Sequence, residues 1–409
     1  MSLYQKASLV QIPSGYKAAD DKLYSVVPNN GDGDFTVTVA AGATRVNKDG
    51  LIESVVADQA RLNYDPTNPQ DPHLLLEPSR ANLITYSELF DNSYWTKENS
   101  SIGTGIVSPM GDTDAQNVIE DTTTGRHRIR VLGSVSSGTS YSFSVWAKST
   151  NRNLVINADA LFNARSGFNL STGVVADTTS GTATITAFPN DWFLCTVTGA
   201  ATSTQTQVFY LQMQTGTTDA NYTGDGSSTL SLFGAQLEAG SYPSSYIPTS
   251  GSAVTRTADF CNIPSGLENV LNTSEGTLFF DLTVSSTSLM RISISDSSSL
   301  NDYILLDLNG GNFKPTVRSD SGYFSPTLKA ATVGERIKIA FTYSSNQIRM
   351  TYDGNTPTTT SITYAPIDTF DLFNFSLFTG NTQIWQGKIY QAMYFNTALT
   401  NAELKTLTS

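Results

Sequence analysis

The sequence predicts an all-β protein in which an N-terminal β lead-in is followed by two antiparallel β-sandwiches. Three observations predict this class. Apolar side chains recur at every second position in many short segments, such as Phe35–Val39, Tyr141–Ala147 and Ile337–Tyr343. Turn residues separate these segments at short intervals. The chain has 409 residues, enough for two or three domains, and its 18 Tyr, 20 Phe and 4 Trp can fill packed cores.

The charge composition narrows the range of partners. Charged residues make up 15% of the chain and give a net charge of −12. An acidic chain is repelled by phosphate backbones, so we expect no nucleic-acid partner. No segment approaches the ~18 apolar residues of a membrane span, and no secretion signal is evident, so we expect no membrane insertion. Cys195 and Cys261 could form one disulfide but not a disulfide framework, and they are predicted to be free thiols.

Residues 1–79 are predicted to form the N-terminal β segment. Phe35–Val39 alternates as a strand does, and Asn47–Gly50 supplies a hairpin turn because Asp-Gly tolerates positive φ angles. Asp65–Pro72 holds three prolines, which remove backbone donors and fix φ, so it is predicted to be a loop. Gly31–Asp34 is similar to a calcium loop but lacks the later carboxylate, so it is predicted to be a turn.

Residues 80–258 are predicted to form the first sandwich and residues 275–409 the second, with residues 259–274 as a linker. In the second sandwich, Leu278–Val284 alternates as a strand that buries one face. Near the end, Thr400 has the spacing of a helix capping box, since a glutamate follows three residues later. The helix would lay two leucines on the sandwich: Leu404 and Leu407.

Three segments carry resemblances to known families. Leu76–Lys97, which begins Leu-Glu-Pro-Ser-Arg and contains Tyr-Ser-Glu, Phe and Trp, resembles the signature that opens a jelly-roll module of bacteriophage tail-fibre, head-fibre and related virion appendage proteins. Leu230–Pro248, with Gly-Ala-Gln-Leu-Glu and Tyr-Pro-Ser-Ser-Tyr-Ile-Pro, resembles the ending of the same module, departing from it at Ser244. Gly387–Leu404 is similar to the last strand and terminal helix of concanavalin A-like, laminin-G-like jelly rolls.

The resemblance implies a structural and adhesive virion protein, a tail or head fibre or a decoration protein. Such proteins are often homotrimers that display lectin-like, carbohydrate-binding sandwiches toward host or environmental glycans. Residues 1–79 would attach to other virion proteins or intertwine with sister chains. The chain would be assembled in the cytoplasm of the bacterial host and located in the virion. We expect no cofactor, although jelly-roll carbohydrate modules often carry one structural Ca²⁺.

Two alternatives remain beside adhesion: a purely structural virion assembly protein, and a tailspike that degrades capsule polysaccharide. The sequence disfavours an enzyme. Neither His73 nor His127 lies near a Gly-x-Ser-x-Gly turn, and no cluster has the spacing of a zinc site. The paired acids of a glycosidase, in a Glu-x-Asp-x-x-Glu pattern, do not occur. We therefore predict neither catalytic residues nor a metal site.

Four residues are candidates for carbohydrate binding. Arg126, Arg128 and Arg130 alternate and would share one face of a strand. They could hold acidic sugars or phosphates by bidentate contacts, or pair with carboxylates on a neighbouring strand or subunit. Trp146 falls on the polar face of its strand, where it could stack on a sugar, form a subunit contact or lie under a covering loop. Trp192 lies in an apolar segment and is predicted to be a core residue.

Overall fold

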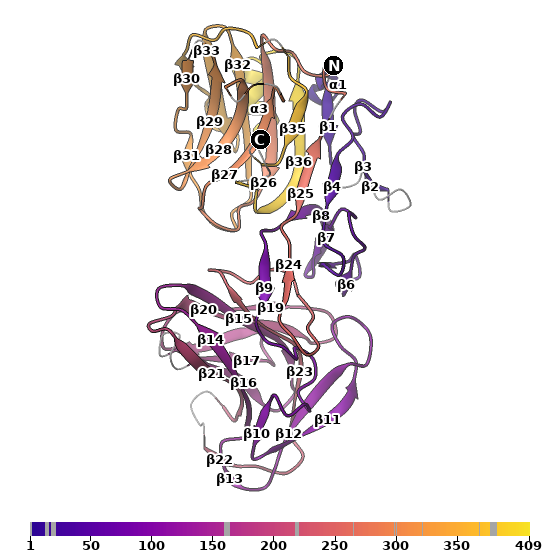
Figure 1. The fold of residues 1–409 in the computed structure, drawn as a ribbon, viewed down its shortest axis with the longest axis vertical. Helices are drawn as coiled ribbons and strands as arrows, with labels where there is room; N and C mark the ends of the chain where they lie inside the picture. Colours follow the sequence, from indigo (N-terminus) through magenta and orange to yellow (C-terminus); the bar gives the residue numbers. More distant parts are fainter. Residues whose placement is uncertain are drawn as a thin grey trace.

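A computed structural model describes residues 2–12, 16–17, 22–158, 164–216, 221–264, 266–297, 299, 301–320, 322–367, 369–376 and 383–409. This part of the chain is built almost entirely from antiparallel strands, which confirms the predicted all-β class. Two β-sandwiches lie one beyond the other, and both chain ends belong to the same one (Figure 1). We call this one the terminal sandwich (residues 9–76 and 260–395) and the other the central sandwich (residues 96–239).

The first sheet of the terminal sandwich combines strands from both ends of the sequence. In spatial order it contains β34 (Thr358–Ser361), β33 (Gln347–Tyr352), β32 (Ile337–Ser344), β26 (Gly276–Leu282), β36 (Gly387–Phe395), β8 (Asn68–Leu76) and β7 (Leu62–Asp65), with β1 (Leu9–Gln11) also paired to β36. Leu278 and Phe280 of β26 point into the core between the sheets, as their alternation predicts.

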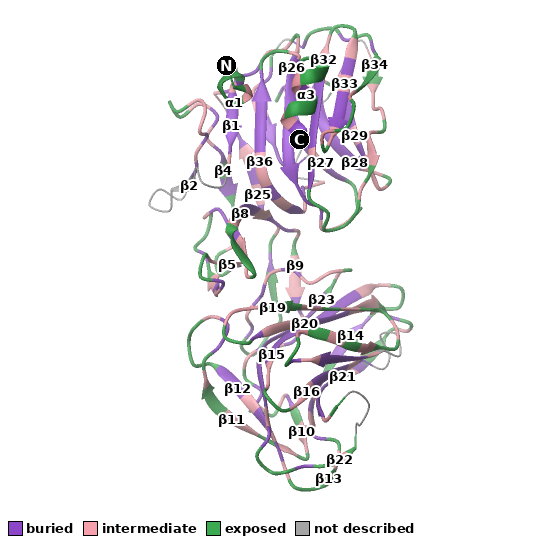
Figure 2. Cartoon of the chain, turned by 180° about the vertical axis from the view of Figure 1, so that it is seen from behind, coloured by how far each residue is buried: buried purple, intermediate pink, exposed green. Residues whose placement is uncertain are grey.

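The second sheet faces the first across one apolar core. In spatial order it contains β30 (Gly322–Phe324), β29 (Asn312–Ser319), β28 (Tyr303–Asn309), β27 (Met290–Ser295), β35 (Leu372–Asn374), β25 (Phe260–Ile263) and β4 (Thr36–Thr38), with β31 (Lys329–Ala330) also paired to β29. The buried strands of both sandwiches are seen in Figure 2. Cys261 lies in this core and Cys195 in the core of the central sandwich, and both are free thiols, as predicted.

Residues 1–79 supply strands to both sheets of the terminal sandwich. Leu9 of β1 pairs with Tyr394, and Val37 of β4 pairs with Cys261 of β25, a strand from the predicted linker. Short elements complete this part: α1 (Leu3–Lys6), and the pairs β2 (Tyr16–Lys17) with β3 (Lys22–Leu23) and β5 (Thr44–Val46) with β6 (Ile52–Ser54). The predicted hairpin turn before Gly50 is confirmed. So is the turn at Gly31–Asp34, where the Asp34 carboxylate accepts a hydrogen bond from a backbone amide. An attachment role for residues 1–79 stays a prediction.

The loop predicted at Asp65–Pro72 is wrong over its second half. Strand β8 begins at Asn68 and includes Pro69 and Pro72. Only Leu74–Leu76 of this strand pairs with β36, so both prolines lie in the part that, among the described strands, has β7 alone as a neighbour. An edge position tolerates proline because the missing amide donor has no partner strand to serve.

The predicted C-terminal helix is confirmed. Helix α3 (Asn401–Thr408) begins after Thr400, whose side chain and backbone form the capping box with Glu403. Leu404 is buried against the outer face of the first sheet and Leu407 packs partly against it. The helix therefore covers a face of β26, β32 and β36 that would otherwise expose apolar residues.

Replacing Thr400 with alanine is expected to destabilise α3 by about 1 kcal/mol, because the side chain caps an unpaired amide of the first turn. Hydrogen exchange of the α3 amides in the full chain measures the effect. Thr406→Ala is the control, since this exposed threonine bonds only to a helix carbonyl. Equal exchange in the two variants would contradict a capping role.

The central sandwich consists of two sheets packed face to face. The first contains β10 (Thr96–Glu98), β14 (Arg128–Val135), β21 (Gln205–Gln214), β16 (Asn153–Ala158), β17 (Ala164–Asn169) and β18 (Val174–Thr178). The second contains β11 (Ser100–Ile106), β12 (Ala115–Glu120), β23 (Thr229–Ala239), β15 (Ser140–Lys148), β20 (Phe193–Ala200) and β19 (Thr182–Ala187). Beside them β13 (Thr124–Gly125) pairs with β22 (Tyr222–Thr223). Phe143 and Phe209 meet in the core, with ring centroids 5.0 Å apart.

Two antiparallel strands join the sandwiches: β9 (Arg80–Asn82) and β24 (Val254–Arg256). A buried ion cluster lies where they enter the terminal sandwich. Arg61 donates to Glu77 at 2.7 Å and also to Asp259, while Arg256 approaches the Glu77 carboxylate at 3.3 Å. Ser245 donates its hydroxyl to Glu77 at 2.7 Å. Glu77 and Ser245 come from the opening and closing parts of the phage-like signature, so the signature residues fasten this junction.

Candidate functional site

The three candidate arginines lie on β14 of the central sandwich or just before it. Arg128 and Arg130 project from the outer face of β14, and both pair with Glu98 of β10, at 2.7 and 2.8 Å. The Arg128 guanidinium also lies over the ring of Tyr210, 4.1 Å from its centroid. Arg126, just before the strand, is exposed and forms no ion pair with the described residues. The structure thus shows the pairing alternative for Arg128 and Arg130, and carbohydrate binding by the three arginines stays a prediction.

Trp146 is buried, which corrects the prediction that it stacks on a sugar. Its side chain is 4% exposed and packs among Ile52, Phe233 and Tyr246, with the Tyr246 ring centroid 5.5 Å away. Residues that precede and follow the central sandwich in the sequence, Ile52 and Tyr246, cover this face of β15. The structure therefore shows the covering-loop alternative. The exposed remainder contributes to a cavity of about 320 Å³ at the junction. Trp192 is a core residue, as predicted.

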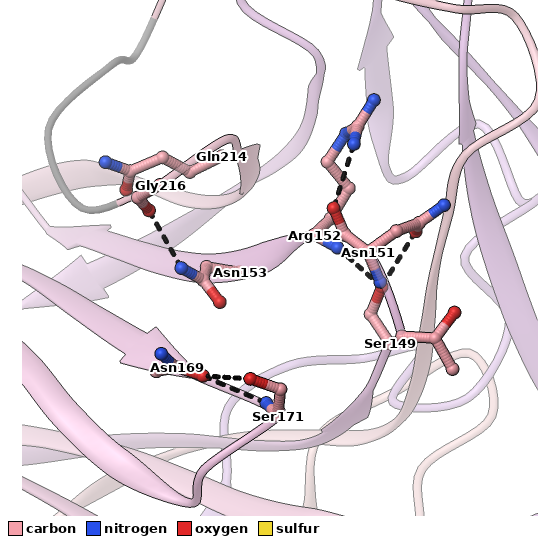
Figure 3. Close-up of a pocket in the computed structure, with 9 residues that line it drawn as sticks. Ser149, Asn151, Arg152, Asn153, Asn169, Ser171, Gln214 and Gly216 are labelled. Atoms are coloured by element: carbon pink, nitrogen blue, oxygen red, sulfur yellow. Dashed lines mark hydrogen bonds between the residues drawn. The ribbon is translucent and has the colours of Figure 1, made fainter.

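A polar pocket of about 220 Å³ lies at one end of the central sandwich (Figure 3). The turn between β15 and β16 forms one wall, and the ends of β16, β17 and β21 form the others. The pocket is lined by Ser149, Thr150, Asn151, Arg152, Asn153, Asn169, Ser171, Gln214 and Gly216. These are the side chains that neutral polar ligands need, because amides and hydroxyls both donate and accept hydrogen bonds.

Strand register places three of these side chains in a row. Gln214 of β21 is directly opposite Asn153 of β16. On the other side Leu154 is opposite Phe168, so Asn153 lies beside Asn169 of β17. Residues opposite each other in antiparallel strands point to the same face. We call Gln214, Asn153 and Asn169 the amide row.

The protein fixes the orientation of two of these amides through one half of each. Asn153 donates from Nδ2 to the backbone carbonyl of Gly216 at 2.8 Å (Figure 3), which leaves its Oδ1 without a partner among the described residues. Gln214 accepts at Oε1 from Arg165 at 2.9 Å. Its Nε2 has no partner in the described part of the chain, although the side chain is 1% exposed. Asn153 Oδ1 is therefore a free acceptor, and Gln214 Nε2 is a free donor.

Asn169 supplies a second donor. Its Oδ1 accepts from the backbone amide and the hydroxyl of Ser171, at 3.0 and 2.8 Å (Figure 3). Its Nδ2 has no hydrogen-bond partner in the described ranges. Because the other half of each amide is held by a donor or acceptor of fixed kind, exchange of oxygen and nitrogen by rotation is disfavoured. The amide row is therefore a preoriented set of one acceptor and two donors.

Arg152, the one charged residue in the described lining of the pocket, is neutralised. Arg152 donates to both oxygens of Glu120, at 2.8 and 2.5 Å, and approaches Asp225 at 3.1 Å. Burial alone would raise the pKa of the Glu120 carboxyl, but hydrogen bonds from Arg152 and Tyr222 outweigh it and hold the pKa below its ordinary value. Glu120 thus stays ionised at neutral pH, and the described residues of the lining offer a ligand no unpaired charge.

In the residues that the structure describes, no helix combines the length and the apolar content that crossing a membrane requires. Among the same residues, no three His, Cys, Asp or Glu side chains gather as metal ligands would.

No protein-family model and no curated protein matches the sequence. Solved structures match parts of the chain. The sialidase module CBM40 of Ruminococcus gnavus, bound to α2,3-sialyllactose, is 13% identical over 35% of this chain and 87% of its own, with a TM-score of 0.32. The NanB sialidase of Streptococcus pneumoniae is 17% identical over 35% of this chain and 25% of its own, with a TM-score of 0.31. The receptor-binding domain of botulinum neurotoxin D is 13% identical over 37% of this chain and 41% of its own, with a TM-score of 0.30.

The sequence alone does not reveal the amide row. Its members lie at positions 153, 169 and 214, far apart in the chain, and no motif links them. The sequence gives only a weak signal: Gln214 ends an alternating segment, whereas Asn153 precedes the continuous apolar run Leu154–Ile156. Only the register between β21, β16 and β17 shows that these three residues are neighbours.

Proposed function

We propose that the pocket at the amide row binds a glycan and that the chain is an adhesive rather than a catalytic protein. The preoriented set of one acceptor and two donors carries this proposal. Each sugar hydroxyl both donates and accepts, so vicinal hydroxyls complement an amide oxygen beside amide N–H groups. Because the amides are held by the protein, little side-chain freedom is lost on binding.

We also propose that the protein is a bacteriophage virion appendage, on the tail or the head, that assembles in the host cytoplasm. The phage-like signature supports this, and its residues Glu77 and Ser245 have a physical role at the junction. A homotrimer attached to other virion proteins is part of the proposal. Light scattering of the purified chain measures the copy number, and labelling this chain on imaged particles locates it. A monomer, or an unlabelled particle, would contradict this part.

Glycan binding is tested with the full chain on a glycan array, followed by affinity measurement for the best saccharide. Asn153→Ala removes the free acceptor and is expected to weaken binding about tenfold or more, the usual effect of leaving buried polar groups unpaired. Asn312→Ala is the matched control. Asn312 also donates from Nδ2 to a turn carbonyl, that of Gly310 at 2.9 Å, but it belongs to the terminal sandwich.

Other outcomes separate the alternatives. A wild-type chain that binds no saccharide on the array would overturn glycan binding and favour the purely structural virion protein. Release of reducing ends from a capsule polysaccharide would instead favour the degrading tailspike. If the Asn153 and Asn312 variants lost affinity equally, the glycan would not bind at the amide row.

A further inference from the structure

The pocket at the amide row continues into a second compartment of about 480 Å³. Ser149, Thr150 and Ser171 line both spaces, so the two adjoin along the turn between β15 and β16. The other residues of the second compartment are Lys148, Leu170, Asp191, Phe193, Thr229 and Ser231. Where the first compartment is lined by amides, the second also contains apolar side chains.

The apolar part of this compartment comes from the open end of the sandwich core. Phe193 begins β20, opposite Ala147 near the end of β15, and its ring is half-buried. Leu170, just after β17, is buried beside it in the same core cluster. The turn after β17 passes close to the ring. A Cβ built on Gly173 would lie 2.7 Å from Phe193 Cε1, and Gly173 has a φ of +67°. The ring is therefore held in place, with part of its surface open to the compartment.

The charges of the second compartment cancel. Lys148 lies with its Nζ 4.9 Å from the centroid of the Trp192 ring, and Asp191 is the other charged lining residue. Among the described residues, one cation and one anion give the lining no net charge, and Arg152 of the first compartment is already paired. A ligand with its own carboxylate would gain from Lys148 but be repelled by Asp191, so an uncharged ligand fits better.

We propose that the two compartments form one groove for a neutral oligosaccharide of at least two sugar units. This rests on the proposed glycan binding and states its ligand class. One unit bonds to the amide row through its hydroxyls. The next unit lays the C–H face of its ring against Phe193. A pyranose has such an apolar face, and removing it from water against an aromatic ring is favourable.

The test measures affinities of the full chain for glucose, galactose and N-acetylglucosamine and for their β-linked disaccharides and trisaccharides. The wild-type chain is expected to bind the preferred disaccharide about five- to tenfold more tightly than its monosaccharide, as burial of on the order of 50 Å² of apolar surface implies. Phe193→Ala is expected to abolish this gain, so that the disaccharide binds no more tightly than its monosaccharide. Asn153→Ala is expected to weaken both.

Two further variants distinguish loss of the sugar contact from a general loss of folding. Phe193→Leu keeps the apolar volume but removes the flat ring, and it is expected to retain only part of the gain. Phe324→Ala truncates another half-buried phenylalanine, in the terminal sandwich, and is expected to leave the gain intact. Equal affinity for monosaccharide and disaccharide, or a gain that survives both Phe193 variants, would overturn the groove while glycan binding stands. A preference for carboxylated sugars would overturn the neutral class. A wild-type chain that binds no saccharide would overturn both proposals.

Discussion

Replacing Arg61 with methionine is expected to lower the free energy of unfolding by about 3–5 kcal/mol. The Arg61 side chain is fully buried and contacts both carboxylates of the junction cluster, Glu77 and Asp259. Methionine fills similar space but leaves Arg256 as the remaining cation beside these two buried carboxylates. Arg256 lies 3.3 Å from the Glu77 carboxylate and 3.7 Å from that of Asp259. Urea denaturation of the full chain, followed by intrinsic fluorescence, measures the loss.

Arg45→Met is the matched control for this variant. Arg45 pairs with Glu53 at 2.6 Å on the β5–β6 hairpin, where both side chains are partly exposed. Such a pair contributes about 1 kcal/mol or less, because water and salt screen it. If both variants lost equally little stability, the buried ion cluster around Arg61 would not stabilise the junction of the two sandwiches.

Stability is expected to fall by roughly 3 kcal/mol as the pH rises from about 4.5 to about 7, because of one buried acid, Glu238. Burial and the nearby Glu77 carboxylate raise its pKa from 4.5 to about 7, against hydrogen bonds from Ser244. A raised carboxyl pKa means that the folded state holds the proton longer than the unfolded state. The stabilisation is therefore complete below the unfolded pKa and is lost as the pH rises through the folded one.

Glu77 acts in the opposite direction. Burial would raise its pKa, but Arg256 and Arg61 lower it to about 2. Its contribution is present above pH 4.5 and is lost as the pH falls toward 2. Together these two groups place the most stable pH near 4.5.

The pH effect is checked by urea denaturation at several pH values between 4 and 8. Glu238→Gln has no carboxyl to titrate, so the slope of stability against pH should flatten in this range, whatever the absolute stability of the variant. Glu268→Gln, at an exposed position, should retain the wild-type slope. A wild-type slope in the Glu238 variant would assign the effect to other groups.

Local patterns in the sequence sufficed for much of the fold. The period of two in Tyr141–Ala147 and Ile337–Tyr343 predicts strands of β15 and β32 because alternate side chains face opposite sides of a sheet. The spacing of Thr400 and Glu403 predicts α3 because a capping box involves only the first helical turn. The alternation of Arg128 and Arg130 also predicts, as one alternative, the carboxylate partner that Glu98 of the neighbouring strand supplies.

What the sequence did not reveal depends on contacts between distant residues. Leu9 and Tyr394 pair across nearly the whole chain, so no local pattern could show that residues 1–79 join the terminal sandwich. Trp146 lies on a polar strand face, but Tyr246 covers it from a segment a hundred residues later. The amide row likewise exists only once three strand ends are in register.

The most direct test of glycan binding is a crystal structure of the full chain with the saccharide that it binds best. A sugar ring is expected at one end of the central sandwich, with hydroxyl groups about 2.7–3.2 Å from Asn153 Oδ1, Asn169 Nδ2 and Gln214 Nε2, as hydrogen bonds require. A saccharide bound elsewhere, such as at Arg126 or in the junction cavity, with the amide row empty, would contradict the account.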